Sequence, residues 1–361
     1  MPDMTAYPSP TGVLCTIVPP HLLDRLARSA DPAVAESARR TLAVDEANRT
    51  ARRLAAAGAV RPAPHGAPAA LGRPRRTIFD AEHRTRLPGR KVRGEGDGPV
   101  RDATVNRAYT GLGSTFELLL HAYGRDSVDG AGLPLEATVH YDRKYANAFW
   151  NGERMVFGDG DGEVFEDFTL AVDVIGHELA HGVTQHTANL LYSGQPGALN
   201  ESVSDVFGSL VKQYTLGQRA GEADWLIGAG LLSDRVRGVA LRSMKAPGTA
   251  YDDDVLGKDP QPATMEDYVD TAADNGGVHI NSGIPNHAFY LTATELGGYA
   301  WERAGRIWYD VLTGGKLGER ADFAAFARLT VAAARGRFGA GGAEAGAVLK
   351  AWSAVGVPTG G

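Results

Sequence analysis

Two histidines stand four residues apart in the segment Gly-His-Glu-Leu-Ala-His at 176–181. On a helix, residues with this spacing lie on one face, so His177 and His181 can bind one metal ion together. Glu178 lies a quarter-turn away, near such an ion without having to ligate it, which suits a general base acting on a water molecule. A histidine pair can also lie on a solvent-exposed helix face, so the motif needs support from a third ligand.

A later segment offers that third ligand. A catalytic zinc ion takes three protein ligands and keeps one position open. The break at residues 194–197 predicts a helix that begins near Ala198 and carries Glu201 and Asp205 on one face. If the two helices fold against each other, Glu201 can be the third ligand and Asp205 can accept the ring N–H of a ligating histidine. The alternative is surface charge, but the neighbouring residues are apolar.

The single cysteine, Cys15, excludes an internal disulfide framework and a cysteine-rich zinc site, so a metal site must use the histidines and carboxylates. The net charge of −6 argues against a nucleic-acid-binding face. No apolar run approaches the roughly 18 residues of a membrane span, so we expect no membrane partner. The first residues have neither a basic region nor a long apolar stretch, so we expect no signal peptide.

The N-terminal part of the 361-residue chain is expected to form a separate unit. Residues 1–58 predict a short extended segment followed by helices, with Asp31 as the N-cap of a helix that runs to about Ala57. Residues 59–76 are rich in proline, alanine and arginine, which predicts an exposed linker. Proteases cut such linkers, so the unit can be detached.

The remainder divides into a mixed region and a helical region. From residue 77 to about 167, turns alternate with short strands, and 133–141 and 154–157 are strand candidates. From residue 170 onward the apolar residues follow helical periodicity. We expect helices near 170–188, 199–215, 284–296, 299–313, 321–336 and 342–354. This pattern predicts an α+β domain followed by an all-α domain.

A third histidine follows paired glycines in the segment Asp-Asn-Gly-Gly-Val-His at 274–279. The glycines permit a tight turn, and Asp274 can keep a nearby imidazole charged. A cationic His279 beside a zinc site would stabilise the oxyanion of a tetrahedral intermediate. By spacing alone, His279 can equally be a simple turn residue.

Together these segments resemble the thermolysin-like metalloendopeptidases from about residue 77 to the C-terminus. The matching motifs also include Tyr-Ala-Asn-Ala-Phe-Trp-Asn-Gly at 145–152, Gly-Asp-Gly-Asp-Gly at 158–162 and Leu-Arg-Ser-Met at 241–244. The resemblance implies a two-domain α+β fold, with a β-rich N-terminal domain (77–188) that includes the zinc-binding helix and an all-α C-terminal domain (189–361). The segment Cys-Thr-Ile-Val-Pro-Pro-His-Leu-Leu at 15–23 is similar to the short propeptides of the protealysin-like subgroup.

The resemblance also implies roles for individual residues. His177, His181 and Glu201 match the ligands of one catalytic zinc ion, and Glu178 matches the general base. His279 matches the residue that stabilises the oxyanion or donates a proton, Asp274 its orienting carboxylate, and Tyr192 a second transition-state donor. The substrate-binding residues of the family correspond to Asn147 and Ala148, on an edge strand that pairs with substrate backbone, and to Arg242.

One departure concerns calcium. The family binds structural calcium through carboxylates near the active-site helix, and Asp173 and Asp224 match two of these ligands. A key glutamate is replaced by Lys212, and two further acidic positions by Leu226 and Ala229. An ammonium group can substitute for the charge of a cation, so we expect that the double calcium site is lost and that calcium dependence is in doubt.

These observations predict a zinc-dependent endopeptidase made as a zymogen, with polypeptide substrates and with its own propeptide as an intramolecular inhibitor. We expect a preference for a bulky apolar residue after the scissile bond, because the resemblance places an apolar pocket there, formed by Phe165, Phe168, Val174, Ile227 and Leu241. The alternatives are another zinc amidase, which the 147–150 strand motif disfavours, and a catalytically silent peptide-binding protein with the same fold.

Two questions stay open at the level of sequence. Cys15 lies beside the Pro-Pro segment expected to cover the active site, so its thiolate can cap the zinc ion in the precursor; alternatively, it is a small buried apolar residue. The compartment is the second question: the resemblance favours secretion by a leaderless route, and a cytoplasmic location is the alternative.

Overall fold

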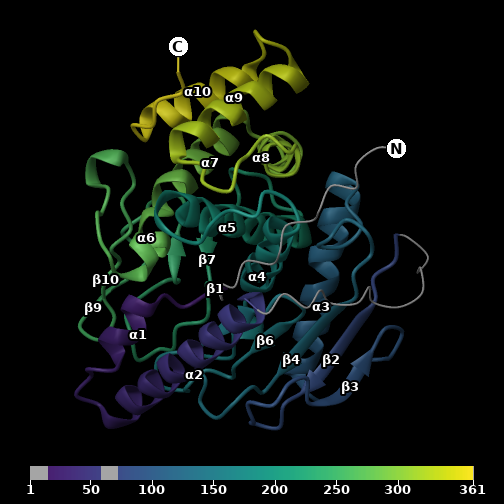
Figure 1. The fold of residues 1–361 in the computed structure, drawn as a ribbon, viewed down its shortest axis with the longest axis vertical. Helices are drawn as coiled ribbons and strands as arrows, with labels where there is room; N and C mark the ends of the chain where they lie inside the picture. Colours follow the sequence, from purple (N-terminus) through teal and green to yellow (C-terminus); the bar gives the residue numbers. More distant parts are fainter. Residues whose placement is uncertain (1–14, 58–71, 361) are drawn as a thin grey trace.

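The computed structural model describes residues 15–57 and 72–360, and every structural statement below refers to these residues. Figure 1 shows a helical region at the top, a sheet region at the lower right and two N-terminal helices at the lower left, with the helices α4 and α5 between them. No helix of the described residues is long and apolar enough to cross a membrane.

The main sheet is completed by the N-terminal segment. Its strand order is β1-β5-β6-β4-β2-β3. These strands are β1 (Cys15–Thr16), β2 (Arg76–Asp80), β3 (Arg90–Gly94), β4 (Leu135–Val139), β5 (Ala148–Trp150) and β6 (Met155–Phe157). The edge strand β1 pairs antiparallel with β5, with Cys15 opposite Trp150 and Thr16 opposite Phe149. Two short hairpins, β7 (Leu226–Ile227) with β8 (Arg242–Ser243) and β9 (Asp252–Asp253) with β10 (Gly257–Lys258), lie outside this sheet.

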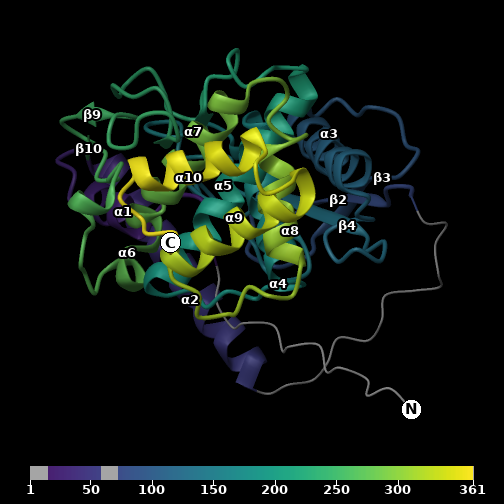
Figure 2. The ribbon, with the colours of Figure 1, turned by 90° about the horizontal axis from the view of Figure 1, so that it is seen from above.

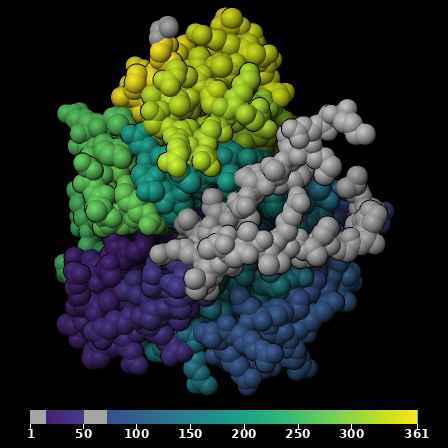
Figure 3. Space-filling model, in the orientation of Figure 1, coloured from purple at the N-terminus to yellow at the C-terminus, as the bar shows by residue number. Residues whose placement is uncertain are grey.

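After β1 the N-terminal unit forms the helices α1 (Pro20–Leu26) and α2 (Pro32–Ala57), and each begins with a proline, which suits the first turn of a helix. The Asp31 carboxylate accepts a hydrogen bond from the N–H of Ala33 (2.9 Å), as expected of a residue at the start of a helix. Figure 3 shows the purple surface of these helices beside the blue surface of the sheet region. Residues 58–71, which hold most of the predicted linker, lie outside the described residues.

A long helix in the mixed region, α3 (Ala103–Glu117), was missed by the sequence analysis, which expected turns and strands there. Asp102 caps it by accepting hydrogen bonds from the N–H groups of Thr104 and Val105. Gly111, which lowers the helix propensity, lies where a Cβ atom would come within 2.3 Å of the side chain of Ile175. The glycine therefore allows α3 to approach α4 closely, a packing reason that local propensity cannot reveal.

The two central helices are α4 (Val172–Gln185) and α5 (Gly194–Leu216). The prediction that the second begins near Ala198 was wrong: α5 starts at Gly194, and Pro196 falls in its first turn, where no backbone hydrogen bond is lost. The helices pack closely, since a Cβ atom at Gly208 would lie 2.4 Å from the carbonyl oxygen of Asp173. This contact holds the side chains of α4 against those of α5.

The C-terminal helices are α6 (Asp274–Asn281), α7 (Gly283–Leu296), α8 (Ala304–Thr313), α9 (Phe323–Phe338) and α10 (Ala343–Ala354). In Figure 1, α7 to α10 lie above α4 and α5, whereas α6 lies beside α5; Figure 2 shows the same helices from above. The helix predicted at 299–313 begins five residues late, at Ala304. Short helical turns occur at Leu118–Ala122, Phe168–Leu170 and Met265–Asp267.

Candidate active site

Helices α4 and α5 bring His177, His181 and Glu201 together, and all three side chains are buried. The Nε2 atoms of His177 and His181 are 3.1 Å apart. Each lies about equally far from Glu201, with His177 Nε2 3.5 Å from Oε2 and His181 Nε2 3.6 Å from Oε1. Ligands of a tetrahedral zinc ion with bonds of about 2.0–2.2 Å are separated by roughly 3.3–3.5 Å, so the three groups have a spacing that fits this metal.

Asp205 orients the first histidine. Its Oδ1 lies 2.8 Å from Nδ1 of His177, so that Nδ1–H is the donor and the lone pair of Nε2 faces the site. The same carboxylate accepts two hydrogen bonds from the guanidinium of Arg242 and one from the amide of Asn286, each 2.8 Å long. Burial opposes the charge of Asp205, but Arg242 and His177 outweigh it and hold the pKa of this carboxyl well below its usual value.

The second histidine is oriented by a residue to which the sequence analysis gave no role. Nδ1 of His181 lies 2.9 Å from Oδ1 of Asn200, in the first half of α5. Burial, the largest influence, lowers the pKa of His181 to about 3 despite the nearby Glu201 carboxylate. The imidazole is therefore neutral, as a metal ligand must be. Asn200 directly precedes Glu201 in the sequence, and this adjacency was the available signal.

Glu178, on α4, is fully buried and lies next to the C-terminal end of β5. Its Oε2 accepts a hydrogen bond from the N–H of Trp150 (2.9 Å), while Oε1 has no hydrogen-bond partner among the described residues. Burial and the neighbouring Glu201 raise the pKa of Glu178 well above its usual value. A raised pKa suits a carboxylate that must take up and release a proton.

A third group of side chains closes the site. His279 lies in α6, after a turn in which residues 275–277 have positive φ angles (50°, 86° and 72°). Its Nδ1 lies 2.6 Å from Oδ1 of Asp274, and its Nε2 lies 3.2 Å from the hydroxyl of Tyr192, which itself donates to Glu201. Burial would lower the pKa of His279, but Asp274 and Glu201 outweigh it and raise the pKa to about 9. His279 is therefore a cation that can face a developing negative charge.

The residues fit a zinc ion by their donor chemistry as well as their spacing. One carboxylate oxygen of Glu201, Oε2, is buried without a hydrogen-bond partner in the part of the chain that the structure describes. A buried carboxylate oxygen without a partner is costly unless a cation or a donor satisfies it. Two imidazoles and one carboxylate form the three-ligand set of catalytic zinc sites.

The N-terminal segment is bound by the residues to which the family resemblance assigns substrate binding. The N–H of Ile17 donates to the carbonyl of Ala148 (3.1 Å), and Arg242 donates to the carbonyl of Ile17 (3.0 Å). Asn147 binds both polar groups of the Val18 backbone, accepting from N–H (2.9 Å) and donating to C=O (3.3 Å). Nε2 of His279 lies 3.1 Å from the carbonyl oxygen of Thr16. The segment thus contacts Asn147, Ala148 and Arg242, the three residues that the resemblance assigns to substrate binding.

Helix α2 supports this arrangement through Asp45, which the sequence analysis missed. The buried Asp45 carboxylate accepts hydrogen bonds from the amide of Asn147 (3.0 Å) and the hydroxyl of Tyr145 (2.5 Å), and burial raises its pKa to about 6. Ser37 and Thr41 also bond to the 144–146 backbone. Polar residues at 37, 41 and 45, spaced by four along one helix face, were the signal.

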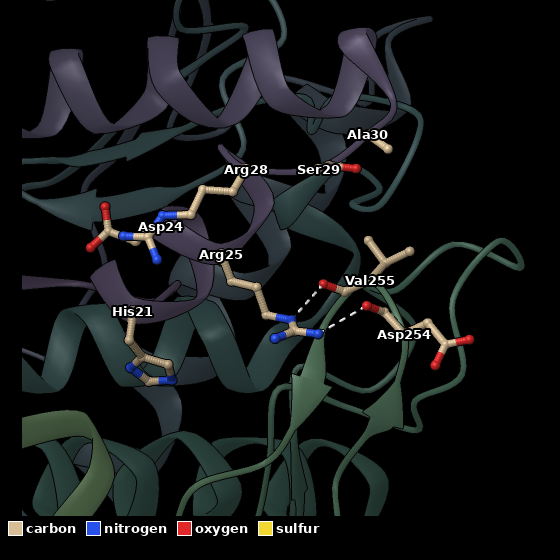
Figure 4. A pocket seen from close by; sticks show the side chains of 8 residues that line it. All are labelled: His21, Asp24, Arg25, Arg28, Ser29, Ala30, Asp254 and Val255. Atoms are coloured by element: carbon tan, nitrogen blue, oxygen red, sulfur yellow. Dashed lines mark hydrogen bonds between the residues drawn. The ribbon is translucent and has the colours of Figure 1, made fainter.

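A pocket separates α1 from the β9–β10 region (Figure 4). It is lined by His21, Asp24, Arg25, Arg28, Ser29, Ala30, Asp254 and Val255. Arg25 reaches across it and donates to the carbonyl oxygens of Val255 (3.0 Å) and Asp254 (2.9 Å). This contact ties the N-terminal unit to the helical part of the chain at a second place.

A separate charged cluster is formed by Lys212, Asp173 and Asp224, at the position where the family binds calcium and where we expected that the calcium site is lost. The ammonium group of Lys212 lies 3.1 Å from Asp173 and 2.7 Å from Asp224, and it donates to the carbonyl of Leu226 (3.3 Å). Burial would lower the pKa of Lys212, but the two carboxylates outweigh it and raise that pKa. The lysine therefore stays charged between them.

Comparisons with known proteins agree with this fold and site. Residues 75–185 match the thermolysin metallopeptidase catalytic domain, and residues 188–357 match the thermolysin metallopeptidase alpha-helical domain. The chain is 51% identical over 344 residues to an extracellular metalloprotease of Pectobacterium carotovorum subsp. carotovorum, covering 95% of this chain and 96% of the relative. It is 52% identical over 284 residues to protease PrtS of Photorhabdus sp. (strain Az29), covering 78% and 76%.

A solved structure is also similar over almost the whole length. The precursor of protealysin, a metalloproteinase from Serratia proteamaculans, matches with a TM-score of 0.87 and 52% identity, covering 95% of this chain and 99% of that one. The fold and the site together define a metalloendopeptidase with the two-domain α+β fold. The chain belongs to the thermolysin metallopeptidase family, as a protealysin-like member, which confirms the predicted family and fold.

Proposed function

We propose that this chain is the precursor of a zinc-dependent endopeptidase that cleaves polypeptides. His177, His181 and Glu201 hold one zinc ion, because their donor atoms have tetrahedral spacing and because Asp205 and Asn200 orient the two imidazoles. When bound, the zinc ion supplies a Lewis acid that polarises a carbonyl oxygen and lowers the pKa of water.

The protein residues divide the remaining chemistry among them. Glu178 accepts a proton from the attacking water through its unpartnered Oε1 and passes it to the leaving amine. His279, held by Asp274, and Tyr192 donate hydrogen bonds to the carbonyl oxygen that gains negative charge during attack.

The observation that carries the proposal is the binding of residues 16–18. The carbonyl of Thr16 faces His279, the N–H of Ile17 bonds to Ala148, and the carbonyl of Ile17 bonds to Arg242. An extended peptide held by backbone hydrogen bonds on a strand edge is bound by β-augmentation, which is independent of its sequence. A polypeptide substrate would bind in the same way, with its scissile bond where the Thr16–Ile17 bond lies.

This register also supports the predicted specificity. Ile17 takes the position directly after the scissile bond, and its side chain is fully buried in the core that includes Phe168, Val174 and Leu241. Burying a Leu or Phe side chain stabilises a complex by about 1.5–3 kcal/mol. We therefore expect roughly ten- to hundredfold higher kcat/KM for Leu or Phe than for Gly at this position. A peptide series that varies only this residue tests it, and a preference for acidic or basic residues contradicts it.

The same contacts support a zymogen. Residues 1–58 act as a propeptide that inhibits by filling the substrate site, and cleavage within the linker at 59–76 releases it. The mature enzyme then comprises the domains 77–188 and 189–361. Because the relatives from Pectobacterium and Serratia are described as an extracellular protease and as a precursor, we place the active enzyme outside the cell.

The test compares the full chain with chain cut in the linker by limited proteolysis. We expect the cut form to hydrolyse casein, a chelator to abolish this activity and zinc to restore it, whereas the uncut form stays inactive. The Glu178→Ala variant of the cut form is the matched control and should remain inactive with zinc bound. A cut form that binds peptides without cleaving them, even with stoichiometric zinc, would establish a silent binding protein instead.

A further inference from the structure

A peptide bond held in a protease active site in the orientation of a substrate should be cut unless the site is disabled. The Thr16–Ile17 bond is held in this way, with backbone hydrogen bonds on both sides of it. Glu178, the proposed base, is in place at the adjoining end of β5. A further feature of the site must therefore explain why this bond is not cleaved and the segment remains an inhibitor.

The residue next to this bond is Cys15. It pairs with Trp150 through β1 and β5, so its backbone position is fixed by the sheet. Its side chain is buried in a small cluster with Tyr192 and Val278, at the active site. The thiol therefore lies beside Tyr192 in the active site, away from solvent.

The sulfur lies beside two of the three proposed zinc ligands, His181 and Glu201. Sγ of Cys15, a ring nitrogen of His181 and a carboxylate oxygen of Glu201 all lie within 4.8 Å of one another. In a tetrahedral zinc site, a sulfur at about 2.3 Å from the metal is roughly 3.5 Å from each nitrogen or oxygen ligand. A small side-chain movement closes this gap. Oε2 of Glu201, which has no hydrogen-bond partner among the described residues, independently indicates a cation position at this carboxylate.

We propose that Cys15 is the fourth ligand of the zinc ion in the precursor, bound through its thiolate sulfur. This inference rests on the zinc site of the proposed function and names how that site is regulated. On ligation the thiol gives up its proton to solvent, and the thiolate takes the position that catalysis reserves for water. The Thr16–Ile17 bond survives because no water can be activated beside Glu178.

The inactivity of the precursor then depends on two separate interactions. The backbone of residues 16–18 blocks the substrate strand, and the sulfur of Cys15 blocks the metal. Zinc favours thiolate as a ligand, so the second interaction strengthens the binding of a propeptide that is otherwise held by hydrogen bonds and apolar contacts. Cutting the linker makes the propeptide a separate chain, and its dissociation exposes the fourth position.

The test uses the intact full-length chain with cobalt(II) in place of zinc. Cobalt–thiolate ligation produces an intense near-ultraviolet charge-transfer band that histidine and carboxylate ligands do not produce. Because Cys15 is the only cysteine in the chain, any such band must come from it. We expect the band in the full chain and its complete loss in Cys15→Ser and Cys15→Ala. X-ray absorption of the zinc form should show one sulfur at about 2.3 Å.

The controls separate this inference from the function on which it rests. Both Cys15 variants must bind one equivalent of cobalt, which shows that the three protein ligands are intact. If the wild-type precursor binds one equivalent without the band, Cys15 is a structural residue and the inference is overturned, while a chelator-sensitive activity of the cut form still supports the protease. If neither form binds the metal, the proposed function fails.

Discussion

Helices α4 and α5 contribute to two clusters of carboxylates, whose negative charge is balanced in different ways. In the catalytic cluster, Glu178 and Glu201 face two histidines, and an oxygen of each glutamate has no hydrogen-bond partner within the described chain. In the second cluster, Asp173 and Asp224 face the ammonium group of Lys212, which contacts both. In the proposed function the first cluster takes its positive charge from a bound metal ion, whereas the second cluster takes it from Lys212.

In the function proposed above, one pair of helices holds a zinc site beside a cluster whose carboxylates are balanced by a lysine. Asp173 and His177 are one turn apart on α4, so the two clusters are neighbours along this helix. What differs is the residue that α5 contributes: an anionic ligand at 201 and a cation at 212. The charge of that residue decides whether a metal ion is needed.

Removing a carboxylate from the catalytic cluster should have the largest effect. In the cut form, from which the propeptide has dissociated, we expect Glu201→Ala to lose the zinc ion and all measurable peptide hydrolysis, because two histidines alone leave the metal too weakly held. The matched control, Asp224→Ala, removes a carboxylate from the lysine cluster and should keep one zinc per chain. Metal analysis of both purified variants checks this, and stoichiometric zinc in Glu201→Ala would contradict the ligand assignment.

Removing the other catalytic carboxylate should separate metal binding from chemistry. Glu178→Gln keeps the shape of the side chain but cannot accept a proton, so we expect kcat of the cut form to fall about 10²–10⁴-fold with zinc still bound. Steady-state hydrolysis of a fluorogenic peptide, together with metal analysis, measures both effects. Activity near the wild-type level would show that another group is the base.

Removing the cation from the second cluster should affect stability rather than activity. In Lys212→Met the buried Asp173 carboxylate loses its charged partner. We expect the free energy of unfolding to fall by about 2–4 kcal/mol, less than for a fully buried pair because Asp224 is partly exposed. Chemical denaturation measures this change. The exposed Lys316→Met is the control and should change stability by less than about 0.5 kcal/mol.

A third charged cluster, nearer the surface, should show a smaller and pH-dependent effect. His140 lies between Asp159 (2.8 Å) and Asp102 (2.8 Å), and the hydrogen bond to Asp159, followed by that to Asp102, raises its pKa to about 9. Because this pKa is raised above the unfolded value near 6.5, the stabilisation is complete below about pH 6.5 and is lost as the pH rises through 9.

The variant His140→Gln measures this contribution. We expect it to lower the free energy of unfolding by about 1 kcal/mol at pH 6, since solvent screens the partly exposed carboxylates, and by much less at pH 9.5. Denaturation curves at the two pH values give the comparison. An equal loss at both pH values would mean that His140 contributes through packing rather than through charge.

Calcium should have the smallest effect of all. Because Lys212 supplies the positive charge between Asp173 and Asp224, we expect the Tm of the native chain to be the same in calcium and in a calcium-selective chelator. Thermal unfolding with zinc held constant checks this. A calcium-dependent rise in Tm would show that a calcium site persists elsewhere in the chain.

Local patterns in the sequence predicted features that depend on neighbouring residues. The bounds of α2 follow from its N-terminal proline and helical composition, and the four-residue spacing of His177 and His181 predicted that both imidazoles share a face of α4. The start of α5 was misjudged because Pro196 can either break a helix or occupy its first turn. Helix α3 was missed because its glycines lower local helix propensity, although Gly111 is required for packing against Ile175.

The sequence by itself determined the family, the two-domain fold and the set of residues that can bind a metal, because spacing along one helix constrains which side chains share a face. Only the tertiary structure decided which of them meet the N-terminal segment. Val18 and Asn147 are 129 residues apart, and Asp45 reaches Asn147 across a similar separation. Such contacts depend on how the sheet and helices pack together, and no local period in the sequence encodes that packing.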